Sequence, residues 1–87
     1  MSDTVHLILK HKWFDLIEKG EKRIEYRDAT EFYRKRLEGK KKVCFHRGYT
    51  STTMTFDIRE IKETLGLFRI YLGSRLPIRK ISTQKTL

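Results

Sequence analysis

Apolar and polar residues alternate over five short segments of the chain, and glycines end several of these segments. The segments span residues 5–10, 22–27, 41–48, 52–61 and 67–73. Successive side chains of a β-strand point to opposite faces, so this alternation predicts strands that bury one face. The last of these strands is expected to end at Gly73.

Two further segments have the spacing of helices. In the first, residues 11–20, the apolar residues Trp13, Leu16 and Ile17 recur at helical intervals, and Trp13 and Leu16 are expected in the core. Gly20 follows at the point where a left-handed residue commonly ends a helix. The first helix is therefore expected to end immediately before Gly20.

The second helical segment is short and basic. Asp28 and Glu31 form a D-x-x-E capping pattern at its start, Leu37 is one of its apolar residues, and Gly39 follows it. The resulting order is β-α-β-α-β-β-β. It predicts an α+β fold, namely a small β-barrel or curled, mainly antiparallel sheet with two short helices at its rim.

The bulk composition favours a single domain with a polyanionic partner. The chain has 87 residues and a net charge of +9, from 20 Lys and Arg against 11 Asp and Glu. We expect a folded domain over residues 1–73 and a basic tail over 74–87. No apolar run is long enough to predict a membrane partner, and no secretory signal is recognised. Cys44 is the only cysteine, which fits a cytoplasmic protein.

The segment GEKRIEYR, residues 20–27, places charges of both signs along a predicted strand. Glu25 and Arg27 are two residues apart and share a face, whereas Lys22 needs a bulge, or a strand that starts after it, to reach Glu25. Two interpretations remain open from the residues alone. The charges either pair on a solvated surface strand or line a polar cleft.

The pattern G-x-K-x-x-E-x-R, formed by Gly20, Lys22, Glu25 and Arg27 after an aromatic-rich helix, resembles the ASCH domain, a family of the PUA-like superfamily. The resemblance extends over residues 4–73. It implies a β-barrel that binds RNA, a nucleoside or a nucleotide in a cleft beside the motif, with Lys22, Glu25 and Arg27 in contact with the ligand.

Some small proteins that resemble this family remove the acyl group from N4-acetylcytidine, using the motif lysine, a threonine and a distant glutamate. Lys22 matches the lysine, but Glu25 stands where the threonine would be. Glu60 and Glu63 are candidates for the distant glutamate by location only. If the protein is an enzyme, Lys22 and Glu25 are the expected catalytic residues.

A basic run extends from Arg34, in the second predicted helix, to Arg47, and the aromatic residues Tyr33, Phe45 and Tyr49 are interleaved with it. Basic side chains can hold phosphates, and aromatic rings can stack on unpaired bases. The residues expected to contact nucleic acid here are Lys40, Lys41, Lys42, His46, Arg47 and Tyr49. A solvated turn is the competing interpretation for the lysines, and a basic module that binds an acidic protein is the competing function.

The histidines have no spacing that is typical of a metal site. His6, His11 and His46 match no usual zinc pattern, and Cys44 has no cysteine partner. The sequence therefore predicts neither a metal site nor a cofactor.

Overall fold

The computed structural model describes residues 3–77, which form five strands and two helices in the predicted order. The strands are β1 (Thr4–Leu9), β2 (Ile24–Asp28), β3 (Lys42–Arg47), β4 (Thr53–Thr64) and β5 (Leu67–Leu76). The helices are α1 (His11–Glu18) and α2 (Glu31–Leu37). Neither helix is long and apolar enough to cross a membrane.

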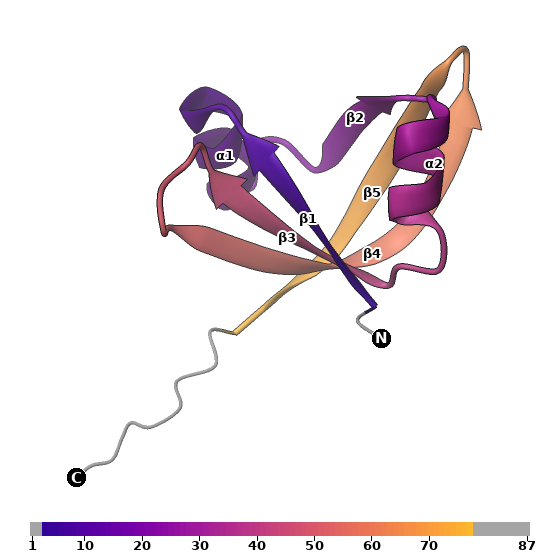
Figure 1. Cartoon of the computed structure of the whole chain (residues 1–87). Coiled ribbons are helices and arrows are strands. Elements are labelled where there is room, and N and C mark those ends of the chain that lie inside the picture. Colours follow the sequence, from indigo (N-terminus) through magenta and orange to yellow (C-terminus); the bar gives the residue numbers. More distant parts are fainter. Residues whose placement is uncertain (1–2, 78–87) are drawn as a thin grey trace, which may run out of the picture.

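The five strands form one sheet in the order β1-β3-β4-β5-β2. Only β1 and β3 pair in parallel, and the other three pairs are antiparallel. The sheet curls into a half-barrel with the two helices at opposite ends (Figure 1). This arrangement confirms the predicted α+β class with a curled, mainly antiparallel sheet. It leaves β1 and β2 as the two edge strands.

The inner face of the curled sheet carries the core. The core side chains come from all the strands except β2 and from both helices, and they comprise Val5, Leu7, Leu9, Phe14, Ile17, Leu37, Val43, Phe45, Met54, Phe56, Phe68, Ile70 and Leu72. The prediction that Trp13 lies in the core is wrong, because Trp13 is 40% exposed. Phe14 and Ile17 are the buried residues of α1, and Leu16 is only half-buried.

The predicted C-terminal end of α1 is confirmed, whereas the predicted N-cap of α2 is wrong. Gly20 has φ of 81° and its N–H bonds to Ile17 O at 3.0 Å, so α1 ends as predicted. The predicted cap of α2 at Asp28 is wrong, because Asp28 ends β2 and Thr30 is the N-cap. The Thr30 hydroxyl accepts the Tyr33 N–H at 3.3 Å.

The last strand is longer than the sequence predicts. β5 continues through Gly73 to Leu76 and pairs there with β4. The first residues of the predicted basic tail thus belong to the sheet, while residues 78–87 lie outside the described part of the chain.

A two-residue turn joins β4 to β5. Leu65 has φ of 54° and Gly66 has φ of 77°, between the paired residues Thr64 and Leu67. Two consecutive positive φ values are the mark of a type I′ turn, which favours Asn-Gly. A leucine at the first position, with its side chain 90% exposed, is strained without any compensating burial.

We therefore expect Leu65→Asn to raise the free energy of unfolding by about 1 kcal/mol, because asparagine tolerates the left-handed region better than leucine does. Urea denaturation measures the change. Leu65→Ala is the matched control, since it removes the exposed apolar side chain but leaves a poorly suited residue in the turn. An equal gain in both variants would contradict the backbone explanation.

Candidate nucleic-acid interface

Strand β2 places Glu25 and Arg27 inward and Tyr26 outward. Glu25 is opposite Ile70 of β5, and Arg27 is opposite Phe68, so both face the same side as the core. Tyr26, between them, is 44% exposed. Within residues 3–77, Glu25 is the one charged residue that is buried, at 7% exposure. A buried carboxylate requires partners for its charge and its oxygens.

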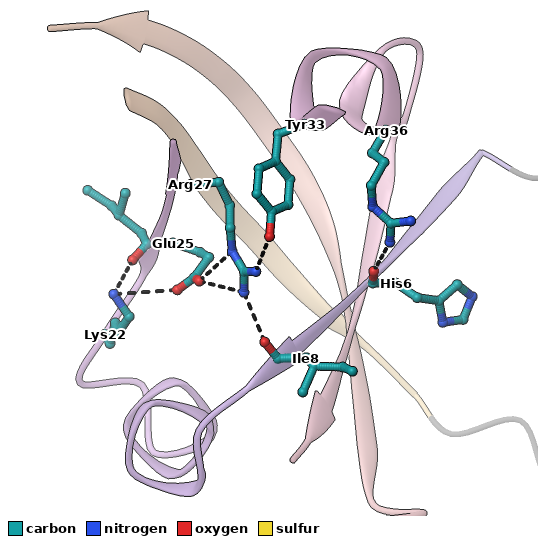
Figure 2. A network of polar contacts seen from close by, with 8 residues as sticks. His6, Ile8, Lys22, Glu25, Arg27, Tyr33 and Arg36 are labelled. Atoms are coloured by element: carbon teal, nitrogen blue, oxygen red, sulfur yellow. Dashed lines mark hydrogen bonds and ion pairs between the residues drawn. The ribbon is translucent and has the colours of Figure 1, made fainter. Parts of the chain in front are cut away.

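Two cations provide those partners (Figure 2). Arg27 donates to Glu25 Oε2 from Nε at 3.0 Å, and its Nη2 lies 2.9 Å from the same oxygen. Lys22 Nζ lies 3.7 Å from Glu25 Oε1. Lys22 reaches Glu25 because β2 starts at Ile24, so Lys22 lies in the turn before the strand. The structure thus brings the three motif side chains together.

Arg27 also connects the two edges of the sheet. Its Nη2 donates to the backbone carbonyl of Ile8 on β1 at 3.1 Å, and its Nη1 donates to Tyr33 Oη on α2 at 3.1 Å. Arg36 of α2 donates to the backbone carbonyl of His6, two residues before Ile8 on β1. We call the line where β1 faces β2 and α2 the seam. Arginine side chains, rather than a strand ladder, span it.

The ammonium group of Lys22 has a second set of neighbours. It donates to Ile24 O at 2.7 Å and lies 5.5 Å from the Trp13 ring centroid and 5.0 Å from that of Tyr26. Its side chain is only 19% exposed. Two rings, a carbonyl and a carboxylate therefore surround the Lys22 ammonium group and hold it in place.

A hollow of about 360 Å³ lies at the seam. Its lining residues are His6, Leu7, Ile8, Arg27, Phe32, Tyr33, Arg36 and Tyr49. Phe32 and Tyr49 are 63% and 93% exposed. The guanidinium of Arg36 lies 5.5 Å from the Phe32 ring centroid. The hollow therefore combines exposed aromatic faces with two arginines.

Lys40, Lys41 and Lys42 lie at the other end of β3 from Arg47. At about 3.3 Å per residue, Lys42 and Arg47, the two ends of β3, are roughly 16 Å apart. Lys40 borders a second hollow of about 310 Å³, which shares His6 and Arg36 with the seam hollow. Lys41 is exposed, and Lys42 lies 3.5 Å from the Asp3 carboxylate. The run of three lysines thus lies next to the seam only at its Lys40 end.

Arg47 and His46 have partners elsewhere in the fold. Arg47 donates twice to the Asp15 carboxylate of α1, at 2.9 Å each, and this hydrogen bonding lowers the pKa of Asp15 and raises the pKa of Arg47. His46 lies 2.9 Å from His6, ring nitrogen to ring nitrogen. Arg47 therefore ties α1 to β3, and Asp15 already balances its charge.

The architecture, a curled five-stranded sheet with a helix at each end, is that of the PUA-like class. The family model of the ASCH domain matches residues 7–72, which is most of the chain. The chain belongs to the ASCH family, as the resemblance of its motif indicated. No curated protein matches the sequence.

Several residues of the seam escaped the sequence analysis. From the sequence, Arg36 belongs to the basic run and His6 is considered only as a metal ligand, while nothing local distinguishes Phe32 or Ile8. Tyr33 is one of the aromatic residues interleaved with the basic run, but its contact with Arg27 is not predicted from the sequence. Their position depends on how α2 packs against β1, and no local pattern in the sequence encodes that packing. The five consecutive aromatic or basic residues of this short helix, residues 32–36, were the available signal.

Replacing Glu25 tests whether its carboxylate holds the seam together. Glu25→Gln leaves Arg27 and Lys22 without a counter-charge in a nearly buried site, so we expect a loss of about 3–5 kcal/mol in the free energy of unfolding. Urea denaturation followed by circular dichroism measures it.

Glu63→Gln is the matched control, because Glu63 forms a two-bond ion pair with Arg34 on the exposed surface. Solvent screens that pair, so its removal is expected to change stability far less. Equal losses in the two variants would contradict a special role for the buried carboxylate.

Proposed function

We propose that this protein binds single-stranded RNA or a nucleotide at the seam hollow. The observation that carries the proposal is the presence of two exposed aromatic rings, Phe32 and Tyr49, around the same hollow as Arg27 and Arg36. Exposed rings offer stacking platforms for unpaired bases, and guanidinium groups hold phosphates. Membership of the ASCH family supports the same type of ligand.

The two arginines have different roles in this proposal. Arg27 already donates to Glu25, Tyr33 and Ile8, so it shapes the hollow and presents a fixed positive charge. Arg36 is exposed, and within residues 3–77 its one hydrogen bond goes to the His6 carbonyl, which leaves guanidinium donors for a phosphate. A strand of RNA would continue from the hollow past Lys35 and Lys40, which border the neighbouring hollow.

Binding is tested by fluorescence anisotropy with a short, labelled single-stranded RNA. We expect micromolar or tighter affinity at low salt. If about four phosphates are contacted, the slope of log K against log salt is expected near −3, at ~0.7 per phosphate. Replacing Lys40, Lys41 and Lys42 together by alanine is expected to flatten this slope. A salt-independent affinity, or none at low salt, would contradict the proposal.

Two pairs of variants locate the site. Phe32→Ala is expected to weaken binding by about 1–3 kcal/mol, the usual value of one base stack. Leu65→Ala is the control, because it removes an exposed apolar side chain that does not line the seam hollow. Arg36→Ala is expected to weaken binding and reduce the salt slope more than Arg59→Ala, which removes the same charge from β4. Equal effects within each pair would place the ligand elsewhere.

A second candidate function is hydrolysis of an acylated nucleoside, and the contact between Lys22 and Glu25 favours it. An amine held beside a carboxylate is a common arrangement for proton transfer. The two distant glutamates considered from the sequence are engaged elsewhere. Glu63 pairs with Arg34 at 2.7 Å, and Glu60 lies 4.0 Å from Lys62.

We expect no release of cytidine from N4-acetylcytidine, because the Glu25 carboxylate would repel the oxyanion that forms during acyl transfer. Chromatography of the reaction mixture measures the release, and Lys22→Ala is the comparison. Turnover by the wild-type protein that falls ~10²- to 10⁴-fold in Lys22→Ala would establish the enzyme instead.

A further inference from the structure

Three potential metal ligands meet on the outer face of the sheet. In the parallel register of β1 and β3, His6 lies opposite Cys44, and His46 follows Cys44 two residues later. Side chains two residues apart on a strand share a face, and so do directly paired residues. The three side chains therefore cluster although His6 and His46 are 40 positions apart in the sequence.

The donor atoms of these residues are close to one another. His6 Nδ1 lies 2.9 Å from His46 Nε2, and Cys44 Sγ lies 3.9 Å from the same His46 nitrogen. When one ligand atom is taken from each of the three residues, these atoms all lie within 4.8 Å of one another. Within residues 3–77 no other group of three histidine, cysteine or acidic residues comes together in this way.

These separations are near those of a tetrahedral zinc site. Bond lengths of about 2.0–2.1 Å to nitrogen and about 2.3 Å to sulfur place two nitrogens about 3.4 Å apart and a nitrogen and a sulfur about 3.6 Å apart. Small side-chain rotations bring the three donors to that geometry. Without a metal, the two imidazoles are at the distance of a simple hydrogen bond, so the competing interpretation is a hydrogen-bonded histidine pair beside an inert thiol.

We propose that His6, Cys44 and His46 bind a zinc ion with three protein ligands and one open coordination position. Thiolate and imidazole ligands suit a borderline-soft divalent ion such as Zn²⁺ better than Mg²⁺ or Ca²⁺, which prefer oxygen. His6 is exposed while Cys44 is buried, so the open position lies toward solvent. Water or an oxygen of a ligand would fill it.

Spacing along the chain predicts no metal site here. The usual zinc patterns hold two ligands a few residues apart, and here the third ligand comes from a neighbouring parallel strand. His6 borders both the seam hollow and the proposed metal site, whereas Cys44 and His46 do not line the hollow. The proposal does not rest on RNA binding, because it is argued from the donor atoms of the three residues and is tested with a metal ion alone. Failure of one proposal therefore leaves the other untouched.

Cobalt substitution tests the site directly. The full chain, prepared without a histidine tag and stripped with a chelator, is titrated with Co²⁺ alone. We expect saturation at an equimolar ratio, with the strong visible absorption of tetrahedral Co²⁺ and a thiolate-to-cobalt charge-transfer band in the near ultraviolet. Added Zn²⁺ is expected to abolish both signals. Absence of the charge-transfer band in the wild-type protein would overturn the proposal.

The variants identify the ligands. Cys44→Ser is expected to remove the charge-transfer band, and His6→Asn and His46→Asn are each expected to weaken Co²⁺ binding at least ~10-fold. His11→Asn is the matched control, because His11 is the remaining histidine and lies outside the cluster. Circular dichroism verifies that each variant is folded. A band that persists in Cys44→Ser, or an equal loss in His11→Asn, would refute the assignment.

Discussion

The ion pair between Glu25 and Arg27 holds the two free edges of this fold together. The curled sheet is not a closed barrel. Strands β1 and β2 lie at the two ends of the strand order and do not pair with each other. Arg27 extends from β2 across the seam to the Ile8 carbonyl of β1 and to Tyr33 of α2. Glu25 fixes the guanidinium in that direction and is itself buried among core residues. A buried ion pair gives modest net stability, but loss of one partner is costly, so the pair acts mainly to specify the arrangement.

The same interaction determines what the surface of the seam offers to a ligand. Because Arg27 donates its hydrogen bonds to protein oxygens, its guanidinium group is a fixed positive charge rather than a mobile one. Arg36 covers the neighbouring carbonyl of β1 and at the same time approaches the exposed ring of Phe32. The edge of a strand, normally a site for unwanted pairing, is thereby converted into a hollow lined by aromatic and cationic groups. The structural role and the proposed binding role of these arginines are thus linked.

Strand β1 contributes both to the seam and to the outer face of the sheet. Val5, Leu7 and Leu9 of β1 pack inward into the core, while His6 and Ile8 point outward. His6 borders the seam hollow and also meets Cys44 and His46. The alternation of a β-strand thus lets a six-residue segment contribute to the core, to the candidate interface and to the proposed metal site.

The sequence by itself determined the element order, the class of fold and the family, because alternation, helical spacing and glycine stops are local signals. It also singled out Lys22, Glu25 and Arg27, since their motif lies within eight consecutive residues. It misplaced Trp13 and the cap of α2, where tertiary packing selected different residues of the same segment. Only the tertiary structure decided that the charged face of β2 points inward, that α2 brings Phe32 and Arg36 to β1, and that His6 lies opposite Cys44. The physical reason is that strand pairing and the curl of the sheet join residues that are far apart in the chain, and no local period records which strands become neighbours.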